Sequence, residues 1–373
     1  MTSPGQPLVE FRGVEKRYSA DARAAVTRLD LTVERGEFLT LLGPSGSGKT
    51  TTLMMLAGFE APSAGDILLE GKSLADRPPY KRNMGVVFQN YALFPHMSVA
   101  ENLAFPLGVR KIKGAAAKEK VDAALALVRL DGLGDRRPDA LSGGQRQRVA
   151  LARALIFEPD LVLMDEPLGA LDRQLREHLQ AEIKRIQRAL SLTIVYVTHD
   201  QGEALTLSDR IAVFADGSIQ QIGSPEQIYD YPSNAFVAGF VGENNMLSAT
   251  VVTRQDRQCT IRLPGGQILH AVATGDIAAG DDVVAAIRPE HVQTGDNQPS
   301  RCNTLDARIG ELVYHGDHSR IRAELDGGGS LVIRTPSRDG IAVSDRLPIG
   351  WCSDRCFAFP VPDITGVSTG NRI

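Results

Sequence analysis

The sequence predicts two domains: an α/β domain with a mainly parallel sheet, followed by a smaller all-β domain. Between residues 8 and 240, apolar runs of strand length alternate with segments of helical periodicity, which is typical of a parallel sheet covered by helices. One of these strands leads through a glycine-rich segment directly into a helix. Beyond Phe240 the runs become short and alternating, with Gly and Asp turns between them, which favours a small barrel or sandwich.

Length and composition are those of a globular protein. The chain has 373 residues, enough for about two domains. Hydrophobic residues make up 43% and charged residues 23%, which excludes a wholly disordered or collagen-like chain. The 41 Lys and Arg against 45 Asp and Glu give a net charge of −4, so we expect no nucleic-acid binding through a domain-wide positive field. The four cysteines are expected to be reduced thiols rather than a disulfide framework.

Neither a membrane-spanning segment nor a secretory signal is expected. A spanning helix needs about 20 nearly continuous apolar residues, and the best stretch, 85–109, is interrupted by polar residues and prolines. The segment Met1–Pro7 has no basic region followed by an apolar run. We therefore expect a cytoplasmic protein whose membrane role, if it has one, comes through partners.

The first domain is predicted element by element from apolar runs and helix signals. Strands are expected at Leu8–Phe11, Leu29–Val33, Glu37–Leu42, Leu161–Met164 and Thr193–Val197. Helices are expected at Thr50–Ala57, Ala115–Leu130, Ser142–Phe157, Gln174–Leu190 and from Asp200 onward. Gly58 and Pro159 end two of these helices, and the range of about 90–160 is expected to form a helical subdomain.

The second domain, 241–360, is predicted from six alternating runs. They are Ser248–Thr253, Thr260–Leu263, Val283–Ile287, Arg308–Tyr314, Ser319–Leu325 and Leu331–Arg334. The stretch Tyr229–Asn245 is expected to connect the two domains, and residues 361–373 to form a loose tail.

The glycine-rich segment has the P-loop pattern. It reads Gly43, Pro44, Ser45, Gly46, Ser47, Gly48, Lys49, Thr50, and it follows a strand and opens a helix, as that pattern requires. Glycines let the backbone wrap a phosphate with its N–H groups turned inward, and the helix N-terminus adds partial positive charge. Lys49 is expected to reach the β- and γ-phosphates of a nucleotide, and Thr50 to ligate Mg²⁺.

Two acids end a second buried strand, and a serine opens a helix. Asp165 and Glu166 follow the apolar run Leu161–Met164, where we expect Asp165 to hold Mg²⁺ and Glu166 to polarise an attacking water. Ser142, Gly143, Gly144 and Gln145 form a helix start with accessible backbone N–H groups. This predicts a second phosphate-binding site, so that a γ-phosphate would be bound from two sides.

Taken in order along the chain, these motifs and Thr198-His199-Asp200 resemble an ABC transporter ATPase subunit. The resemblance covers about residues 8–240. It implies that two copies pair head to tail, each ATP lying between one P-loop and the opposite Ser-Gly-Gly-Gln signature. It also implies roles for His199 as the switch histidine at the γ-phosphate and for Gln89 as the Q-loop residue near Mg²⁺ and the nucleophilic water. Asp172 matches the D-loop that crosses the dimer. Tyr18 matches the aromatic residue that stacks on adenine; the alternative is that Tyr18 is packed in the core. Thr51 is expected to bind the nucleotide together with the P-loop residues.

The stretch after Gln89 is rich in apolar residues. Tyr91, Leu93, Phe94, Met97 and Phe105 are too many for a solvated loop, so they are either core or an interface. In the family that the motifs resemble, this region contacts a cytoplasmic helix of the membrane subunit.

The C-terminal half resembles that of importer ATPases with an OB-like accessory domain, called TOBE. Gly242-Glu243-Asn244-Asn245 and Tyr314-His315-Gly316-Asp317 look most like the spermidine/putrescine subgroup. The resemblance implies ATP hydrolysis that energises polyamine import, with two permease subunits and a substrate-binding protein as partners, at the cytoplasmic face of the membrane. Alternatives are the same ATPase role for a sugar, iron, sulfate or another organic ion, a non-transport ABC ATPase acting on DNA or ribosomes, and a regulatory role for the β domain.

Overall fold

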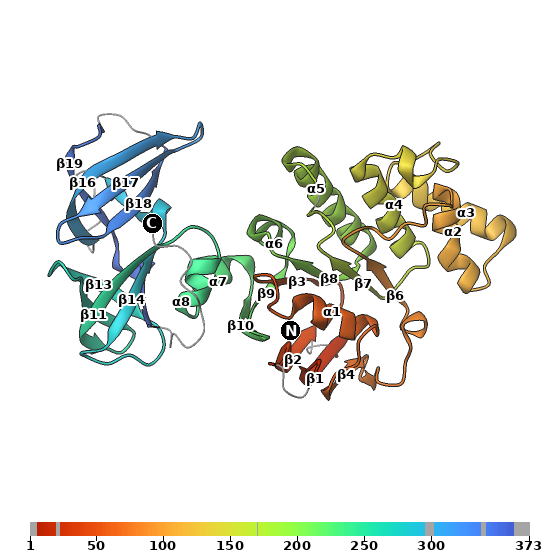
Figure 1. The fold of residues 1–373 in the computed structure, drawn as a ribbon, viewed down its shortest axis with the longest axis horizontal. Coiled ribbons are helices and arrows are strands. Elements are labelled where there is room, and N and C mark those ends of the chain that lie inside the picture. Colours follow the sequence, from red (N-terminus) through yellow and green to blue (C-terminus); the bar gives the residue numbers. More distant parts are fainter. Residues whose placement is uncertain (1–5, 20–22, 170, 295–301, 337–340, 362–373) are drawn as a thin grey trace. The chain divides into compact units, whose positions relative to one another are not determined.

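The protein folds into two compact units, Met1–Glu226 and Gln227–Ile373, in a computed structural model (Figure 1). The structure describes residues 6–19, 23–169, 171–294, 302–336 and 341–361. Each unit has its own hydrophobic cores. The division falls before the predicted boundary at residue 240, so the whole of the predicted connection, Tyr229–Asn245, belongs to the second unit.

A six-stranded sheet with the order β10-β9-β3-β8-β7-β6 forms the centre of the first unit. Every residue of β3, β7 and β8 is buried, which explains why these strands appear in the sequence as continuous apolar runs. All neighbouring pairs are parallel except β10 with β9. The strands are β3 (Phe38–Leu42), β6 (Met84–Val87), β7 (Leu161–Asp165), β8 (Thr193–Thr198), β9 (Arg210–Ala215) and β10 (Ser218–Gly223).

Different helices cover the two faces of this sheet. Val162 and Tyr196 face a core formed mainly with four helices, whereas Leu163 and Val197 face a core formed with α1 and a second sheet. The helices of the first core are α2 (Val99–Val109), α3 (Gly114–Leu127), α4 (Gly143–Leu155) and α5 (Arg173–Leu190). Helix α1 (Lys49–Ala57) therefore lies on the opposite face from α4 (Figure 1).

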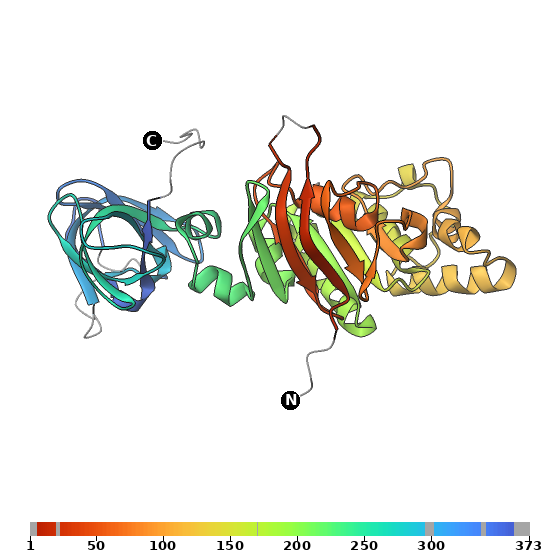
Figure 2. The same cartoon turned by 90° about the horizontal axis from the view of Figure 1, so that it is seen from below.

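The second sheet of this unit is antiparallel and has the order β2-β1-β4-β5. Its strands are β1 (Val9–Lys16), β2 (Val26–Val33), β4 (Ala64–Leu69) and β5 (Lys72–Ser73). Figure 2 shows the long β1 and β2 strands side by side. The apolar sides of β1 and β2 pack in the same core as α1 and so support the P-loop helix from outside.

The predicted elements of the first unit are present, with shifted ends. The helix expected at Ala115–Leu130 is α3 and ends earlier, because Val128 is its C-cap and Arg129 adopts a φ of +56°. Helix α6 (Gln201–Leu207) begins where Asp200 accepts a hydrogen bond from the Glu203 backbone N–H. Helix α2 was not expected; it starts with a capping box at Ser98 and contains Pro106, which obscures its periodicity.

The second unit is mainly β, as the sequence predicts. Strands β11 (Asn245–Gln255), β12 (Gln258–Arg262), β13 (Ile268–Ala273), β20 (Cys356–Pro360) and β14 (Asp282–Ile287) close into a barrel. A five-stranded sheet combines β15 (Gln293–Thr294), β19 (Arg346–Cys352), β16 (Cys302–Tyr314), β17 (Ser319–Leu325) and β18 (Ser330–Thr335). Trp351 is buried in the core that both share.

Two short helices occupy much of the stretch expected to connect the domains. They are α7 (Pro225–Asp230) and α8 (Ala235–Phe240). The predicted tail 361–373 lies outside the described residues apart from Val361. Within the described part of the chain, no helix is long and apolar enough to cross a membrane.

Candidate functional site

The P-loop joins β3 to α1 at the carboxyl end of the sheet, and its shape depends on glycine. Gly46 and Gly48 have φ values of +79° and +100°. A Cβ on Gly48 would lie 2.4 Å from the Ala25 carbonyl oxygen, so the loop is also seated against the chain just before β2. The left-handed backbone turns consecutive N–H groups toward one side, which is the arrangement that cradles a phosphate.

Lys49 is buried at the base of this loop. Its Nζ donates to the carbonyl oxygens of Gly43 and Pro44, at 2.8 Å each. Burial lowers the pKa of the ammonium group, and the nearby Glu166 and Asp165 carboxylates oppose that shift. A buried ammonium whose hydrogen bonds go to neutral carbonyls, beside a helix N-terminus, favours binding of an anion.

Thr50 and Asp165 meet at the same edge. The Thr50 hydroxyl donates to Asp165 Oδ1 at 3.0 Å, across the space between α1 and the end of β7. Burial raises the pKa of the Asp165 carboxyl, and the hydrogen bond from Thr50 opposes that shift. These two oxygen donors match the ligands that Mg²⁺ prefers.

Glu166 is held between the two other residues expected to be catalytic. Its Oε2 accepts from Gln89 Nε2 at 3.3 Å, and its Oε1 lies 3.1 Å from His199 Nδ1. The three residues follow β7, β6 and β8, whose carboxyl ends meet at one edge of the parallel sheet. Glu166 adopts a φ of +43°, and its N–H donates to the Val197 carbonyl, so the backbone holds the carboxylate in an uncommon conformation.

Tyr18 presents an exposed ring beside the P-loop helix. Its side chain is 62% exposed, which excludes the core-packing alternative. Its hydroxyl lies 3.4 Å from Thr51 Oγ1, and Lys16 Nζ lies 5.0 Å from the ring centroid. The ring is therefore placed to stack on a planar group of a molecule bound in the P-loop.

The signature residues are not brought to the P-loop. Ser142 and Gln145 form a capping box at the start of α4: Ser142 Oγ accepts from the Gln145 N–H at 3.3 Å, and Gln145 Oε1 accepts from the Ser142 N–H at 2.9 Å. Gly143 and Gly144 are in the first turn of the same helix, which packs on the face of the sheet opposite α1. Asp172 caps α5 on that same face, accepting from the Leu175 N–H at 2.9 Å.

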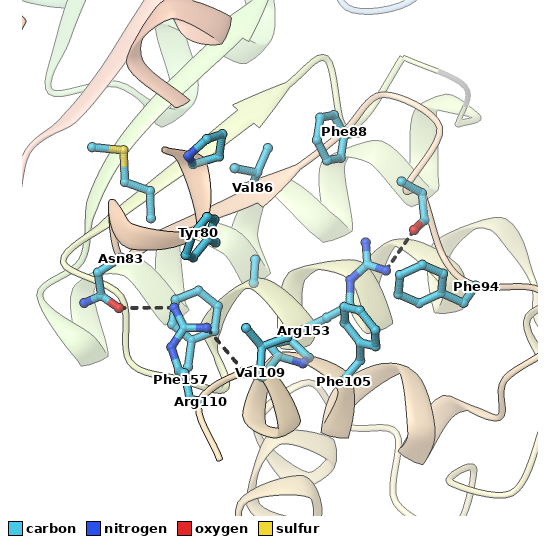
Figure 3. A pocket seen from close by; sticks show the side chains of 15 residues that line it. Tyr80, Asn83, Val86, Phe88, Phe94, Phe105, Val109, Arg110, Arg153 and Phe157 are labelled. Carbon is cyan, nitrogen blue, oxygen red and sulfur yellow. Dashed lines mark hydrogen bonds between the residues drawn. The ribbon is translucent and has the colours of Figure 1, made fainter. Parts of the chain in front are cut away.

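An apolar groove of about 390 Å³ lies beside the Q-loop (Figure 3). Phe94 and Phe105 line it with Tyr80 and Val109, and Phe105 is 45% exposed. Tyr91 and Leu93, by contrast, pack against the core on the α4 face. The apolar stretch after Gln89 is thus part core and part open surface.

Two arginines in this groove were missed by sequence reasoning. Arg153 donates to the carbonyl oxygens of Tyr91 and Ala92, at 2.9 and 2.8 Å, and Arg110 lies 3.6 Å from the Phe157 ring centroid. Tyr91 and Ala92 both have positive φ values. The only sequence signal for Arg153 is an arginine among the alanines and leucines of α4, which does not by itself point to a loop 61 residues away.

Two protein-family profiles match the chain. The ABC transporter family profile matches residues 26–169, and the TOBE domain profile matches residues 285–359. The chain is 44% identical to the spermidine/putrescine import ATP-binding protein PotA of Frankia alni, over 96% of this chain and 81% of that protein. It is 48% identical to the spermidine/putrescine import ATP-binding protein PotA 1 of Pseudomonas aeruginosa, over 88% of this chain and 90% of that protein.

Two solved structures resemble part of the chain. One is the structure of cbiO1 from Clostridium perfringens, part of an ABC transporter complex. The match covers 60% of this chain and 91% of the cbiO1 chain, with a TM-score of 0.55 and 28% identity. The dimeric structure of MJ0796, a bacterial ABC transporter cassette, covers 58% and 98%, with a TM-score of 0.53 and 31% identity. The chain therefore belongs to the ABC transporter family, as an ATP-binding subunit with the family's ATPase activity and a C-terminal TOBE domain.

Proposed function

We propose that this chain is the ATP-hydrolysing subunit of a multi-subunit importer for spermidine and putrescine. The observation that carries the hydrolytic part is the placement of Glu166, one residue after Asp165, between Gln89 and His199. The names of the relatives support the substrate. Because substrate selection belongs to other subunits, a sugar, iron, sulfate or other organic ion remains the alternative.

The residues of the chain divide the chemistry among them. P-loop N–H groups and Lys49 bind the phosphates, and Lys49 exchanges its loop carbonyl partners for phosphate oxygens. Thr50, Asp165 and Gln89 supply oxygen donors that fit Mg²⁺, which when bound neutralises charge developing on the phosphates. Glu166 accepts a proton from the attacking water, and His199 donates to the γ-phosphate.

A single chain holds only half of the site. The signature Ser142–Gln145 and the D-loop residue Asp172 lie on the face of the sheet opposite α1. A second copy, packed head to tail, would bring its signature to this P-loop and its Asp172 to the same nucleotide. One similar solved structure is that of a dimeric bacterial ABC transporter cassette, which supports the formation of a dimer.

The groove beside the Q-loop is the surface proposed to meet the membrane subunits. Its aromatic lining and open face suit the apolar side of a short helix from a permease, and its wall includes Phe88, the residue before Gln89. Closure of the dimer on ATP would then pull on that helix. In this arrangement two permeases and a substrate-binding protein complete the transporter, and the chain is peripheral at the cytoplasmic face of the membrane.

The test is uptake of labelled putrescine and spermidine in cells that lack other polyamine importers. Wild type is compared with Glu166→Gln at matched protein levels, because the glutamine side chain has the same size as the glutamate it replaces but cannot act as a base. General-base catalysis contributes about 10²–10⁴-fold, so uptake by the variant falls to background. Wild-type ATPase activity in the assembled complex without polyamine uptake would reject the substrate.

The dimer is tested separately, by gel filtration with ATP. The Glu166→Gln variant binds ATP without hydrolysing it and should therefore elute as a dimer. A variant that binds ATP and remains monomeric would contradict the composite site.

A further inference from the structure

Arg176 makes contacts that the proposed catalytic scheme does not use. It lies in the first turns of α5, shortly after the D-loop residue Asp172. Its Nη2 donates to the carbonyl oxygen of Leu171 at 3.1 Å, and its Nη1 donates to Asp200 Oδ2 at 2.8 Å. One guanidinium group thus joins the residue before Asp172 to the residue after His199.

The His199 side of this link is itself firmly held. The Asp200 N–H donates to Thr198 Oγ1 at 3.0 Å, and Asp200 Oδ1 caps α6. Glu203 accepts from the hydroxyls of Tyr196 and Thr198, at 2.7 Å each, and is only 2% exposed. Arg176 Nε lies 3.8 Å from Glu203 Oε1, so two carboxylates face the guanidinium.

The Leu171 side is fixed by different means. Asp172 uses its carboxylate to cap α5, so the D-loop ends at a defined point of the helix that carries Arg176. A displacement of the D-loop carbonyl must either carry the His199 segment with it or break the hydrogen bonds of Arg176. Hydrogen bonds that involve a charged group are about twice as strong as neutral ones, so the first course is favoured.

We propose that Arg176 is a positioning residue that couples the two ATP sites of the dimer. The inference rests on the proposed function, in which Asp172 reaches the nucleotide held by the partner's P-loop while His199 serves the nucleotide of its own chain. Arg176 then makes the position of His199 depend on whether the opposite site is occupied. Planar fork geometry is required, because a lysine can bond one of the two partners but cannot span both in the same orientation.

The experiment compares three conservative variants of the full chain in the assembled transporter. Arg176→Lys and Asp200→Asn each break the link from a different side while keeping the size of the side chain. Arg173→Lys is the matched control, because Arg173 lies on the same helix, is 93% exposed and pairs only with Glu177 among the described contacts. For each we measure the affinity of the single chain for a fluorescent ATP analogue, the kcat and the Hill coefficient for ATP.

Arg176→Lys and Asp200→Asn should leave nucleotide affinity of the single chain unchanged. Their kcat should fall by between about tenfold and 100-fold, as for other misplaced catalytic groups, and their Hill coefficient should drop toward about 1. The double variant should be no worse than either single variant, since both remove one link. Arg173→Lys should behave as wild type.

Two results would overturn the proposal in distinguishable ways. If wild type is cooperative and both variants keep its Hill coefficient, Arg176 does not couple the sites and the dimer proposal stands. If wild type itself is monomeric with ATP and shows no cooperativity, the composite site fails and the coupling fails with it. Should Arg176→Lys not fold, Asp200→Asn alone decides the question.

Discussion

Replacing Gly48 with alanine should damage the P-loop far more than the same change at Gly46. Both glycines have left-handed backbones, which cost an L-residue about 1–2 kcal/mol. They differ in surroundings, because a Cβ on Gly46 meets nothing within 4 Å, whereas one on Gly48 lies 2.4 Å from the Ala25 carbonyl oxygen. That distance is about 1 Å shorter than the 3.4 Å at which ordinary contact begins.

The Ala25 carbonyl group cannot easily retreat. The N–H of the same residue donates to the Lys16 carbonyl at 2.8 Å, which holds Ala25 against the end of β1. Relief must come from the P-loop itself, at a cost of about 1–3 kcal/mol for overpacking. We therefore expect Gly48→Ala to be less stable than Gly46→Ala by that amount, a difference of roughly 2–12 °C in the melting temperature of a unit of this size.

Thermal unfolding and nucleotide titration of the two variants test this directly. Because the displaced backbone carries the phosphate-binding N–H groups, Gly48→Ala should also lose about tenfold or more in ATP affinity, which is about 1.4 kcal/mol. Equal melting temperatures and equal affinities for the two variants would refute the argument from the Ala25 contact.

Three further outcomes follow from the site. Tyr18→Ala should weaken ATP binding by about fivefold, corresponding to about 1 kcal/mol of stacking, while Tyr18→Phe retains it; equal affinity for both in a titration would remove Tyr18 from the site. Ser142→Ala should lower the free energy of unfolding by about 1 kcal/mol, because the helix cap is lost, and should reduce turnover. The affinity of the single chain for ATP should not change; a loss of that affinity would place the signature at the chain's own P-loop. Burial raises the pKa of Glu203, so the folded state binds its proton more tightly than the unfolded state, and stability falls as pH rises above about 4.5. Glu203→Gln should remove this pH dependence when the melting temperatures of variant and wild type are compared from pH 4 to 8. Parallel curves of melting temperature against pH for the two proteins would contradict this prediction.

Much of the first unit could be predicted because its signals are local. β3, β7 and β8 are buried on both faces and appear as unbroken apolar runs, and Gly58 ends α1 in the left-handed conformation expected of a helix-ending glycine. The meeting of Glu166 and His199 also follows from local facts, since both come after predicted strands of one parallel sheet. The strand before Gln89, β6, was not among the predicted strands, and Gln89 was assigned from the family resemblance alone.

The missed elements depend on distant partners. β13 and β20 lie far apart in the sequence and pair in parallel to help close the barrel, which no short pattern reveals. β19 contains Pro348 and Gly350, two residues that weaken any strand signal, and is stabilised by its neighbours β15 and β16. The Arg153 and Arg176 contacts join side chains to loop carbonyls, and such contacts depend on how whole helices are placed.

A single sheet separates α1 from α4, and this separation determines which parts of the site one chain can supply. A P-loop that held its own signature would bind and hydrolyse ATP without reference to any other molecule. The sheet places Ser142 on the face away from Lys49, so the chain's own fold keeps its signature from its P-loop. In the proposed dimer, a second copy would close over the nucleotide to complete the site. The groove beside Gln89 and the link through Arg176 both lie on elements that such a closure would move. A partner bound in the groove and the nucleotide in the opposite site would therefore both affect the same closure.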